Sequence, residues 1–291
     1  MPRTPHVALV TCAQIPELDA DERLLLEPLA ARGITARPVV WDDPAVDWDA
    51  IDLAVVRNTW DYPTRHEQFA AWAHRVPRLA NPAAVIEWNI DKRYLAELAG
   101  AGVTVIHTDW YAPGEVPRLG DEGMWVVKPT VSAGSQDTER YDLTSPQRRA
   151  LAGAHVARLH SAGKTAMAQP YLSAVDTAGE TALLYFRGHF SHAVRTGPML
   201  NGNHLDSTGL YVTEEISPRV PSAAELAAAD KVLAAVPGGA EALLYARVDL
   251  IPGEDGEPTL LELELAEPSL FFAHDDGAAG RFADAVVSLL D

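Results

Sequence analysis

Cysteine is nearly absent from this chain of 291 residues, which contains Cys12 and no second thiol. A disulfide within the chain is therefore excluded, and we expect Cys12, at the end of an apolar run, to be a small core residue. No apolar run approaches the roughly 18 residues of a membrane-spanning helix. Residues 1–14 also lack the apolar centre of a signal peptide. These shortages favour a cytoplasmic protein without a membrane partner.

Basic residues are also in short supply. The net charge is −18, which makes nucleic acid and anionic membranes poor partners. Only four of the 23 cationic residues are lysine. Against that background a lysine on an apolar strand, such as Lys128, indicates a specific anion. The composition leaves a homo-oligomer open.

What the chain does contain is enough apolar sequence, 47% of residues, for two or three domains. Residues 1–103 alternate short apolar strands with amphipathic helices, which predicts a βαβ domain with a parallel sheet. We expect a small domain over residues 104–172 and an antiparallel sheet with helices over residues 173–291. The predicted fold class is α/β, with an α+β C-terminal part. Ligands of such parallel sheets bind beyond the carboxyl ends of the strands.

Two helices are predicted with particular start or stop signals. Residues 81–103 are interpreted as a turn, one helix and a glycine stop. Ser222 and Glu225 have the spacing of a capping box, which predicts that a helix begins there.

An acidic strand near the C-terminus, TLLELELAEPSL, carries Glu262 and Glu264 two residues apart. In a strand both carboxylates point to one face, and the leucines at 261, 263 and 265 point to the other. A hairpin turn centred on Asp255-Gly256 would pair this strand with the preceding YARVDLIP. Asp249 would then face Glu262, and Arg247 would face Glu264.

Three carboxylates on one face of a sheet, from Asp249, Glu262 and Glu264, repel one another. A hard cation removes that repulsion, and Mg²⁺ prefers oxygen ligands that include substrate phosphates. The neighbouring Arg247 would stabilise charge on a phosphate. The alternative is a solvated sheet face on which the acids confer solubility. Glu267 is expected to be a solvated loop charge.

Lys128 follows three apolar residues in WVVKPTVSAGSQD. Ser132, Gly134 and Ser135 in the next loop are small enough for backbone amides to approach phosphate oxygens. The spacing differs from that of a Walker A loop. Taken alone, the pattern is equally typical of a solvated lysine at a strand end.

A possible substrate site follows the third expected strand, at its ligand end. There Arg57 would pair with a carboxylate and Asp61 with an ammonium group, while Thr59 would orient either. Trp60 and Tyr62 would wall the cavity. The alternative is a capped turn whose aromatic residues seal the sheet. Residues 201–211 are either a substrate or lid loop or an ordinary polar loop.

The order of these patterns resembles the ATP-grasp superfamily. A helix with NIDKRYL is followed by VVKP and a small-residue loop, then by AQPYL, GETALLYF, Arg-Val-Asp and Glu-Leu-Glu. The resemblance extends over roughly residues 81–267, and the N-terminal βαβ region matches the pre-ATP-grasp domain in kind. It implies an ATP-grasp fold and an enzyme that uses ATP and Mg²⁺ on a small amino-acid-like molecule.

The resemblance also implies roles for residues that bind the nucleotide. Lys92 and Lys128 are similar to the two lysines that hold ATP phosphates, and residues 132–136 to the mobile phosphate lid. Glu180 resembles the carboxylate that binds the ribose hydroxyls, with Asp176 as its competitor. The interdomain hinge, whose backbone would read the adenine edge, corresponds to Gln169, Pro170, Tyr171 and Leu172.

For the metal and catalytic residues, the resemblance implies that Asp249, Glu262 and Glu264 are the metal triad. Arg247 matches the basic residue before the metal aspartate, and Arg195 is a further cation for phosphate or substrate. Many family members have asparagine at the position of Glu264. The third carboxylate makes two Mg²⁺ ions more natural than one.

Within the superfamily, residues 39–65 and the run ELELAEPSLFF are most similar to the O-ureido-D-serine cyclo-ligase type, which closes the D-cycloserine ring. The implied reaction activates a carboxylate as an acylphosphate, which a nitrogen of the same molecule attacks. An intermolecular carboxylate–amine ligase of the dipeptide type is the first alternative. The second is a non-catalytic ATP-binding regulatory module.

Overall fold

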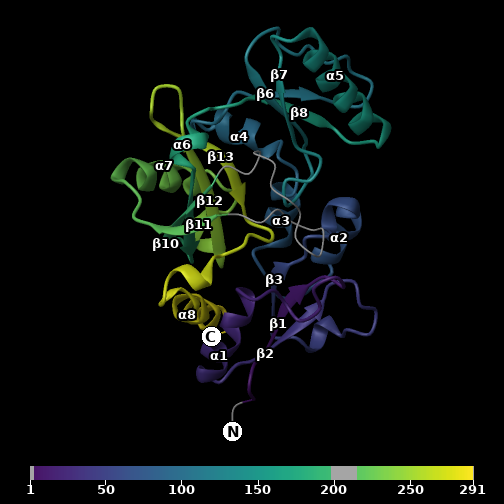
Figure 1. The fold of residues 1–291 in the computed structure, drawn as a ribbon. Helices are drawn as coiled ribbons and strands as arrows, with labels where there is room; N and C mark the ends of the chain where they lie inside the picture. The colour runs from purple at the N-terminus through teal and green to yellow at the C-terminus, as the bar shows by residue number, and fades with distance from the viewer. Residues whose placement is uncertain (1–2, 198–214, 291) are drawn as a thin grey trace.

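The computed structural model describes residues 3–197 and 215–290, so residues 201–211 lie outside the described part. The N-terminal strands form a parallel sheet in the order β2-β1-β3-β4, as the alternating pattern predicted. These strands are β1 (His6–Thr11), β2 (Thr35–Val40), β3 (Leu53–Asn58) and β4 (Leu79–Ala80). Helices α1 (Leu26–Ala31) and α2 (His66–Ala73) lie between them in the chain (Figure 1).

A second sheet, which we call the central sheet, is antiparallel and has the order β11-β10-β9-β12-β13. Its strands are β9 (Glu180–Phe186), β10 (His189–Thr196), β11 (Ile216–Arg219), β12 (Tyr245–Pro252) and β13 (Pro258–Glu264). The associated helices are α6 (Val175–Ala178), α7 (Ala223–Ala234) and α8 (Ala278–Leu290). Helix α7 begins with the predicted capping box of Ser222 and Glu225.

The third sheet is smaller, is antiparallel and has the order β5-β8-β6-β7. It consists of β5 (Asp109–Tyr111), β6 (Met124–Pro129), β7 (Glu139–Asp142) and β8 (Ala166–Pro170). Helix α5 (Pro146–Ser161) packs on it through Ala152, Val156 and Leu159. Figure 1 shows this unit as a separate lobe above the rest of the molecule.

The prediction of one helix within residues 81–103 is wrong. The chain instead forms α3 (Ala83–Asn89) and α4 (Tyr94–Gly100), with a break between them. In the break, the Lys92 backbone N–H donates to the Thr130 carbonyl at 2.8 Å instead of continuing the helix. The glycine stop is confirmed, because Gly102 has a φ of 85°.

The cores join the N-terminal and central sheets closely. Val55 of β3, Leu184 of β9 and Phe282 of α8 belong to one apolar cluster. Leu95 and Leu98 of α4 pack with the opposite face of the central sheet. The domain limits 1–103, 104–172 and 173–291 stay predictions, but this packing makes the first and last segments one continuous body.

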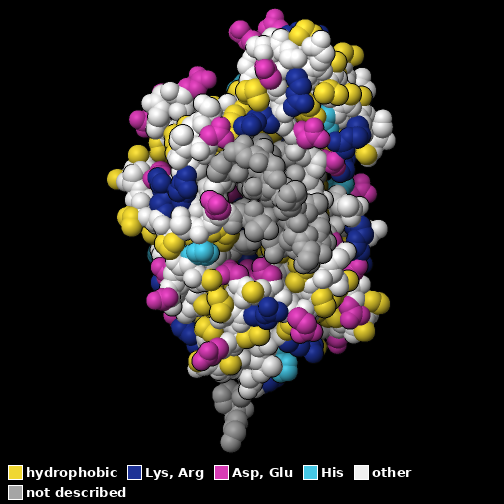
Figure 2. All heavy atoms as spheres, viewed as in Figure 1, with side chains coloured by type: hydrophobic (Ala, Val, Ile, Leu, Met, Phe, Trp, Pro, Cys, Tyr) yellow, Lys and Arg dark blue, Asp and Glu magenta, His cyan; other side chains and the backbone are white. Residues whose placement is uncertain are grey.

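The surface carries mixed charge on the face that Figure 2 shows, where acidic and basic side chains are interspersed over the described residues. Within the described residues, none of the helices combines the length and apolar character needed to cross a bilayer.

Candidate active site

The hairpin of β12 and β13 has the predicted register around its charged residues. Arg247 faces Glu264, and Asp249 faces Glu262. Beyond Asp249 the register shifts, so that Leu250 faces Leu260. The shift is a β-bulge, which inserts an extra residue and changes the alternation of side chains.

The bulge corrects the expectation for Leu261. It packs with Ile251, Tyr171 and Leu172 in an apolar cluster that lines a pocket, instead of joining the core of Leu263. No residue type in the strand signalled the extra position, so the alternating pattern alone placed Leu261 on the wrong face.

This pocket lies where the central sheet, the small sheet and the N-terminal unit meet. It brings together most of the residues singled out in the sequence. The predicted site residues in its lining are Trp60, Tyr62, Lys92, Lys128, Ser132, Gly134, Ser135, Gln169, Pro170, Tyr171, Leu172, Glu180, Arg247, Asp249, Glu262 and Glu264.

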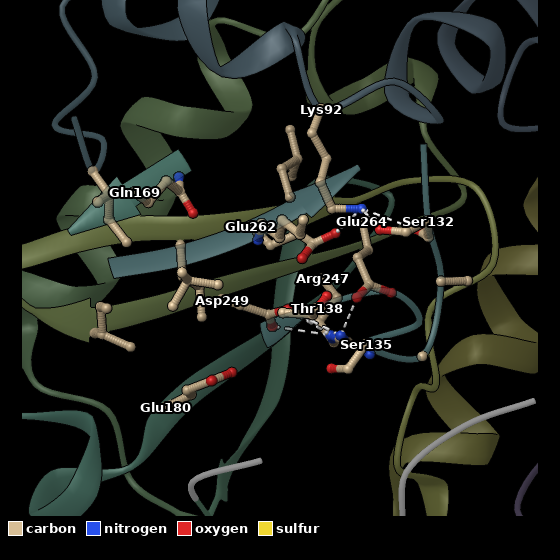
Figure 3. Close-up of a pocket in the computed structure, with 18 of the residues that line it drawn as sticks. Lys92, Ser132, Ser135, Thr138, Gln169, Glu180, Arg247, Asp249, Glu262 and Glu264 are labelled. Atoms are coloured by element: carbon tan, nitrogen blue, oxygen red, sulfur yellow. Dashed lines mark hydrogen bonds and ion pairs between the residues drawn. The ribbon is translucent and has the colours of Figure 1, made fainter. Parts of the chain in front are cut away.

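Lys92 joins the loop after β6 to the acidic hairpin. Its ammonium donates to the Ser132 carbonyl at 2.9 Å and to the Ser132 hydroxyl at 3.2 Å, and it lies 3.0 Å from Glu262 Oε1 (Figure 3). The helix break before α4 makes this possible, because it turns the Lys92 side chain toward β13. Ser132 of the predicted lid and Glu262 of the metal-site candidate therefore share the Lys92 ammonium.

Arg247 bridges the other two acids of the hairpin. Its Nε lies 2.9 Å from Asp249 Oδ1, and its Nη2 forms an ion pair with Glu264. Burial raises the pKa of Asp249, which Arg247 opposes; burial also raises the pKa of Glu264, to which Asp249 and Glu262 add. The repulsion expected among these carboxylates is thus present, and the guanidinium offsets part of it.

Lys128 is buried to 8% exposure in the same pocket. Among the described residues, no hydrogen bond or ion pair reaches its ammonium. Burial, with help from Lys92, lowers its pKa, while Glu262 acts in the opposite direction. Burial also acts to raise the pKa of Glu262, but Lys92 and Lys128 together hold it below the usual value. Lys128 is therefore a buried cation that can bind an anion without losing a hydrogen bond or ion pair to the described residues.

The three carboxylates do not converge on one point. Within the described residues, no group of three His, Cys, Asp or Glu side chains is arranged to hold a metal ion. Figure 3 shows the reason: Arg247 lies between Asp249 and Glu264, while Glu262 turns toward Lys92. The oxygen donors suit Mg²⁺ in kind, but their present partners are side-chain cations.

The opposite end of the pocket is apolar and carries the predicted hinge. Gln169 Nε2 donates to the Thr108 hydroxyl at 2.9 Å, and the Tyr171 N–H donates to the Met124 carbonyl at 2.8 Å. Ile106, Val175, Ile251 and Leu261 add an apolar wall that the sequence interpretation did not identify.

Three predicted substrate residues do not line the pocket. Arg57 is fully buried, and its Nε and Nη2 both lie 2.7 Å from Glu22, so it is not available to a substrate carboxylate. Thr59 is also fully buried. Asp61 accepts from Trp41 Nε1 at 3.0 Å and pairs with Arg65. Trp60 and Tyr62 alternate with these residues and point the other way, into the pocket.

Asp176 and Arg195 also lie outside the pocket lining. Asp176 accepts from the Tyr171 hydroxyl at 2.6 Å, which leaves Glu180 as the acid inside the pocket. Arg195 donates to the Ala178 and Thr177 carbonyls at 2.5 and 2.9 Å. Its contacts are therefore with the turn before β9 rather than with the cavity.

Glu267 was expected to be a solvated loop charge, and this is wrong. Its side chain is 8% exposed and lines the pocket. Burial raises its pKa to about 7, although Lys92 and a hydrogen bond with Tyr62 act in the opposite direction. Strand β13 ends at Glu264, and the chain then continues without regular structure past Glu267 along the pocket.

Comparison with known proteins gives consistent matches. The model of the N-terminal domain of D-cycloserine synthetase DcsG matches residues 7–81. The cycloserine biosynthesis protein DcsG of Streptomyces lavendulae is 38% identical, with 98% of both chains covered. This protein belongs to the D-cycloserine synthetase family. It is therefore an enzyme of the ATP-grasp ligase class, as its sequence patterns indicated.

Solved structures agree with this assignment. The crystal structure of D-cycloserine synthetase DcsG matches with a TM-score of 0.86 and 36% identity, covering 98% of this chain and 100% of that one. The ATP-grasp ligase PsnB, complexed with a phosphomimetic variant of its minimal precursor, Mg and ADP, matches with a TM-score of 0.65 and 16% identity over 99% of both chains. The fold is thus the ATP-grasp fold.

Proposed function

We propose that this protein is an ATP-dependent cyclo-ligase that closes the ring of D-cycloserine from O-ureido-D-serine. The observation that carries the proposal is the pocket itself. One cavity holds the buried Lys128, the acidic hairpin and an apolar hinge, in a chain that aligns end to end with a cycloserine biosynthesis protein. A ligase of this kind has to hold the nucleotide, the substrate carboxylate and the attacking nitrogen next to one another, so it needs these three parts of the pocket to be adjacent.

For the nucleotide, we propose that the base lies against the apolar wall at residues 169–172 and the ribose near Glu180. The phosphates would reach Lys128 and Lys92, with the backbone of residues 132–135 closing over them. The absence of an internal partner for Lys128 among the described residues supports this orientation. Arg247 would contact the phosphoryl group as charge moves.

For the metal, we propose that Asp249, Glu262 and Glu264 hold Mg²⁺, with two ions as the preferred number. The chemistry of the donor set supports the ion, because all three offer carboxylate oxygens. Their pairing with Arg247 and Lys92 shows that cations already offset their charge. Ion binding would require Arg247 to release one of its two carboxylates.

The proposed chemistry divides between ATP and the chain. When bound, ATP supplies the phosphoryl group that activates the substrate carboxylate as an acylphosphate. Lys92, Lys128 and Arg247 stabilise negative charge, and the loop that Lys92 anchors through Ser132 excludes water, which would hydrolyse the activated carboxylate. The oxygen-linked nitrogen of the ureido group in the same substrate would then attack the acylphosphate, so that the ring C–N bond forms as the bond to phosphate breaks. One water molecule would hydrolyse the carbamoyl group that remains on this nitrogen, releasing it as carbon dioxide and ammonia.

We also propose the three domain limits given above and a location in the cytoplasm. Each proposed domain contains one of the three sheets, although the first and third pack together as one body. The lone buried Cys12 supports a reducing compartment.

The decisive experiment incubates the full-length protein with ATP, Mg²⁺ and O-ureido-D-serine, and measures ADP and D-cycloserine. We expect one ring for each ADP released, and no ADP release when EDTA removes the metal. Consumption of two different amino acids per ADP would instead identify an intermolecular ligase. Absence of ADP release with a panel of D- and L-amino acids would leave the non-catalytic ATP-binding module.

A further inference from the structure

The segment 265–269, directly after β13, is held in an unusual way. Each of its five consecutive carbonyls accepts a hydrogen bond from a side chain rather than from a neighbouring strand. The donors are Asn81 to Leu265 at 2.7 Å, Tyr245 to Ala266 at 2.8 Å, Trp60 to Glu267 at 3.1 Å, Arg57 to Pro268, and Arg247 to Ser269 at 3.3 Å. Buried carbonyls require partners, and here five separate side chains supply them.

These donors come from the N-terminal unit and from β12, so the segment is fixed from both sides. The ion pair with Glu22 fixes the guanidinium of Arg57, and this fixed group donates to the Pro268 carbonyl. Backbone that is fixed at every residue determines where its side chains point. Within this segment, Glu267 is the residue with an ionisable side chain, and it lines the pocket.

Glu267 differs from the three acids of the β12–β13 hairpin. Asp249 and Glu264 pair with Arg247, and Glu262 pairs with Lys92. No ion pair within the described part of the chain joins Glu267 to a basic side chain. A carboxylate that is 92% buried beside a cavity is costly without a cation, and the raised pKa of Glu267 reflects that cost.

Two aromatic side chains contact Glu267, one at its backbone and one at its side chain. Trp60, whose indole N–H donates to the Glu267 carbonyl, and Tyr62, whose hydroxyl interacts with the Glu267 side chain, both line the pocket. Aromatic faces attract cations and exclude water, which strengthens an ion pair formed between them. The site suits a compact organic cation with a single positive charge.

We propose that Glu267, with Trp60 and Tyr62, binds the α-ammonium group of the amino-acid substrate. The inference rests on the proposed function for the identity of the substrate, and it deepens that function by naming the residue that selects an α-amino acid. It also transfers to Glu267 the role that the sequence had indicated for Asp61, whose carboxylate is occupied by Trp41 and Arg65. The substrate carboxylate then points toward Lys128 and the acidic hairpin, where activation takes place.

The test compares each α-amino acid with its N-acetyl derivative, which lacks the positive charge. The probes are O-ureido-D-serine, D-serine and D-alanine, each with its N-acetyl form, added to full-length protein with ADP and Mg²⁺. Binding is measured by calorimetry, and ADP release with ATP is measured in parallel. We expect wild-type protein to prefer the free ammonium form, and Glu267→Gln to weaken its binding by at least about 30-fold. The affinity for the N-acetyl form should change by less than about threefold.

Glu267→Gln retains the backbone carbonyl that Trp60 contacts, so it is expected to fold, and an unchanged affinity for ADP checks this. Two further variants, of Tyr62 and Glu254, separate the effect of the charge from that of packing. Tyr62→Phe should weaken ammonium binding less, by about threefold to tenfold. Glu254→Gln, an exposed acid in the hairpin turn, is the matched control and should change nothing.

The outcomes distinguish this inference from the proposed function. If D-serine binds in a manner that depends on Glu267 but O-ureido-D-serine gives no ring, the cyclo-ligase assignment fails and the ammonium site stands. If Glu267→Gln keeps the wild-type preference for the free amine, or lowers turnover of both forms equally, the ammonium site is overturned. Failure of every probe to bind wild-type protein would also overturn it.

Discussion

Two groups of buried charges, one that contacts the segment 265–269 from the N-terminal unit and one in the pocket, are built differently. In the first, Arg57 and Glu22 form a closed pair in which the guanidinium contacts Glu22 twice and also the carbonyls of Val56 and Pro268. In the pocket, Lys128 is also buried, to 8% exposure, but no hydrogen bond or ion pair reaches its ammonium among the described residues. The closed pair uses its charge for the fold, whereas the pocket keeps charge available for a ligand.

The difference shows that burial alone does not identify a functional charge. Arg57 is completely buried and further stabilised by the Tyr245 ring, 4.8 Å from its guanidinium carbon. Its Nε, Nη1 and Nη2 atoms all donate hydrogen bonds to acceptors inside the protein. What distinguishes Lys128 is a buried charge without an internal ion pair beside a cavity. Variants should separate the closed pair from the pocket residues by their effects on stability and on activity.

The largest expected effect is on catalysis. Glu262→Gln removes the negative charge that Lys92 and the proposed Mg²⁺ share, so kcat for ADP release should fall on the order of 1,000-fold. The fold should persist, because the amide has the same shape. Steady-state kinetics and thermal unfolding measure both quantities, with Glu254→Gln as the control. Normal ADP production by the variant would remove Glu262 from the metal site.

The closed pair should behave in the opposite way. Arg57→Met leaves Glu22 buried without a cation and should lower the free energy of unfolding by about 3–5 kcal/mol. Adding Glu22→Leu should recover much of that loss, because no buried charge remains. Urea denaturation of the single and double variants measures this. An Arg57→Met protein of wild-type stability that fails only to bind substrate would restore the original prediction for Arg57.

Lys128→Met should weaken nucleotide binding roughly 10- to 100-fold, since a charged contact to phosphate is lost. Stability should stay equal or increase, because the variant removes a buried ammonium and breaks no internal pair. Calorimetry with ADP and Mg²⁺ gives the affinity, and Lys231→Met on the exposed side of α7 is the control. Unchanged nucleotide affinity would place Lys128 outside the site.

The smallest expected effect concerns the support of the segment 265–269. Tyr245→Phe deletes a hydroxyl that donates to the carbonyls of Val56 and Ala266, at 3.0 and 2.8 Å. The free energy of unfolding should fall by about 1–2 kcal/mol. Tyr185→Phe, whose hydroxyl contacts the partly exposed Asp230, should cost less. Equal losses in the two variants would argue against a special role for the buried carbonyls.

Much of the fold was accessible from local patterns. The parallel N-terminal sheet, the antiparallel hairpin and its pairing of Asp249 with Glu262 follow from strand alternation and from turn residues, which act over short distances. The break between α3 and α4 was not accessible, because it depends on a hydrogen bond from Lys92 to Thr130, 38 residues away in the sequence numbering. Local propensity favoured one continuous helix there.

By itself, the sequence determined which chemistry is present: acids alternating on one strand, a rare lysine after an apolar run, and the order of motifs typical of ATP-grasp ligases. Only the tertiary structure decided which of these charges are open to a ligand. Glu22 lies 35 residues before Arg57 and pairs with it, while side chains of Trp60 and Tyr245 hold the backbone that places Glu267 in the pocket lining. Contacts of this kind form only when segments far apart in the sequence pack together. The free-energy cost of burying a charge therefore depends on that packing and not on the neighbouring residues along the chain.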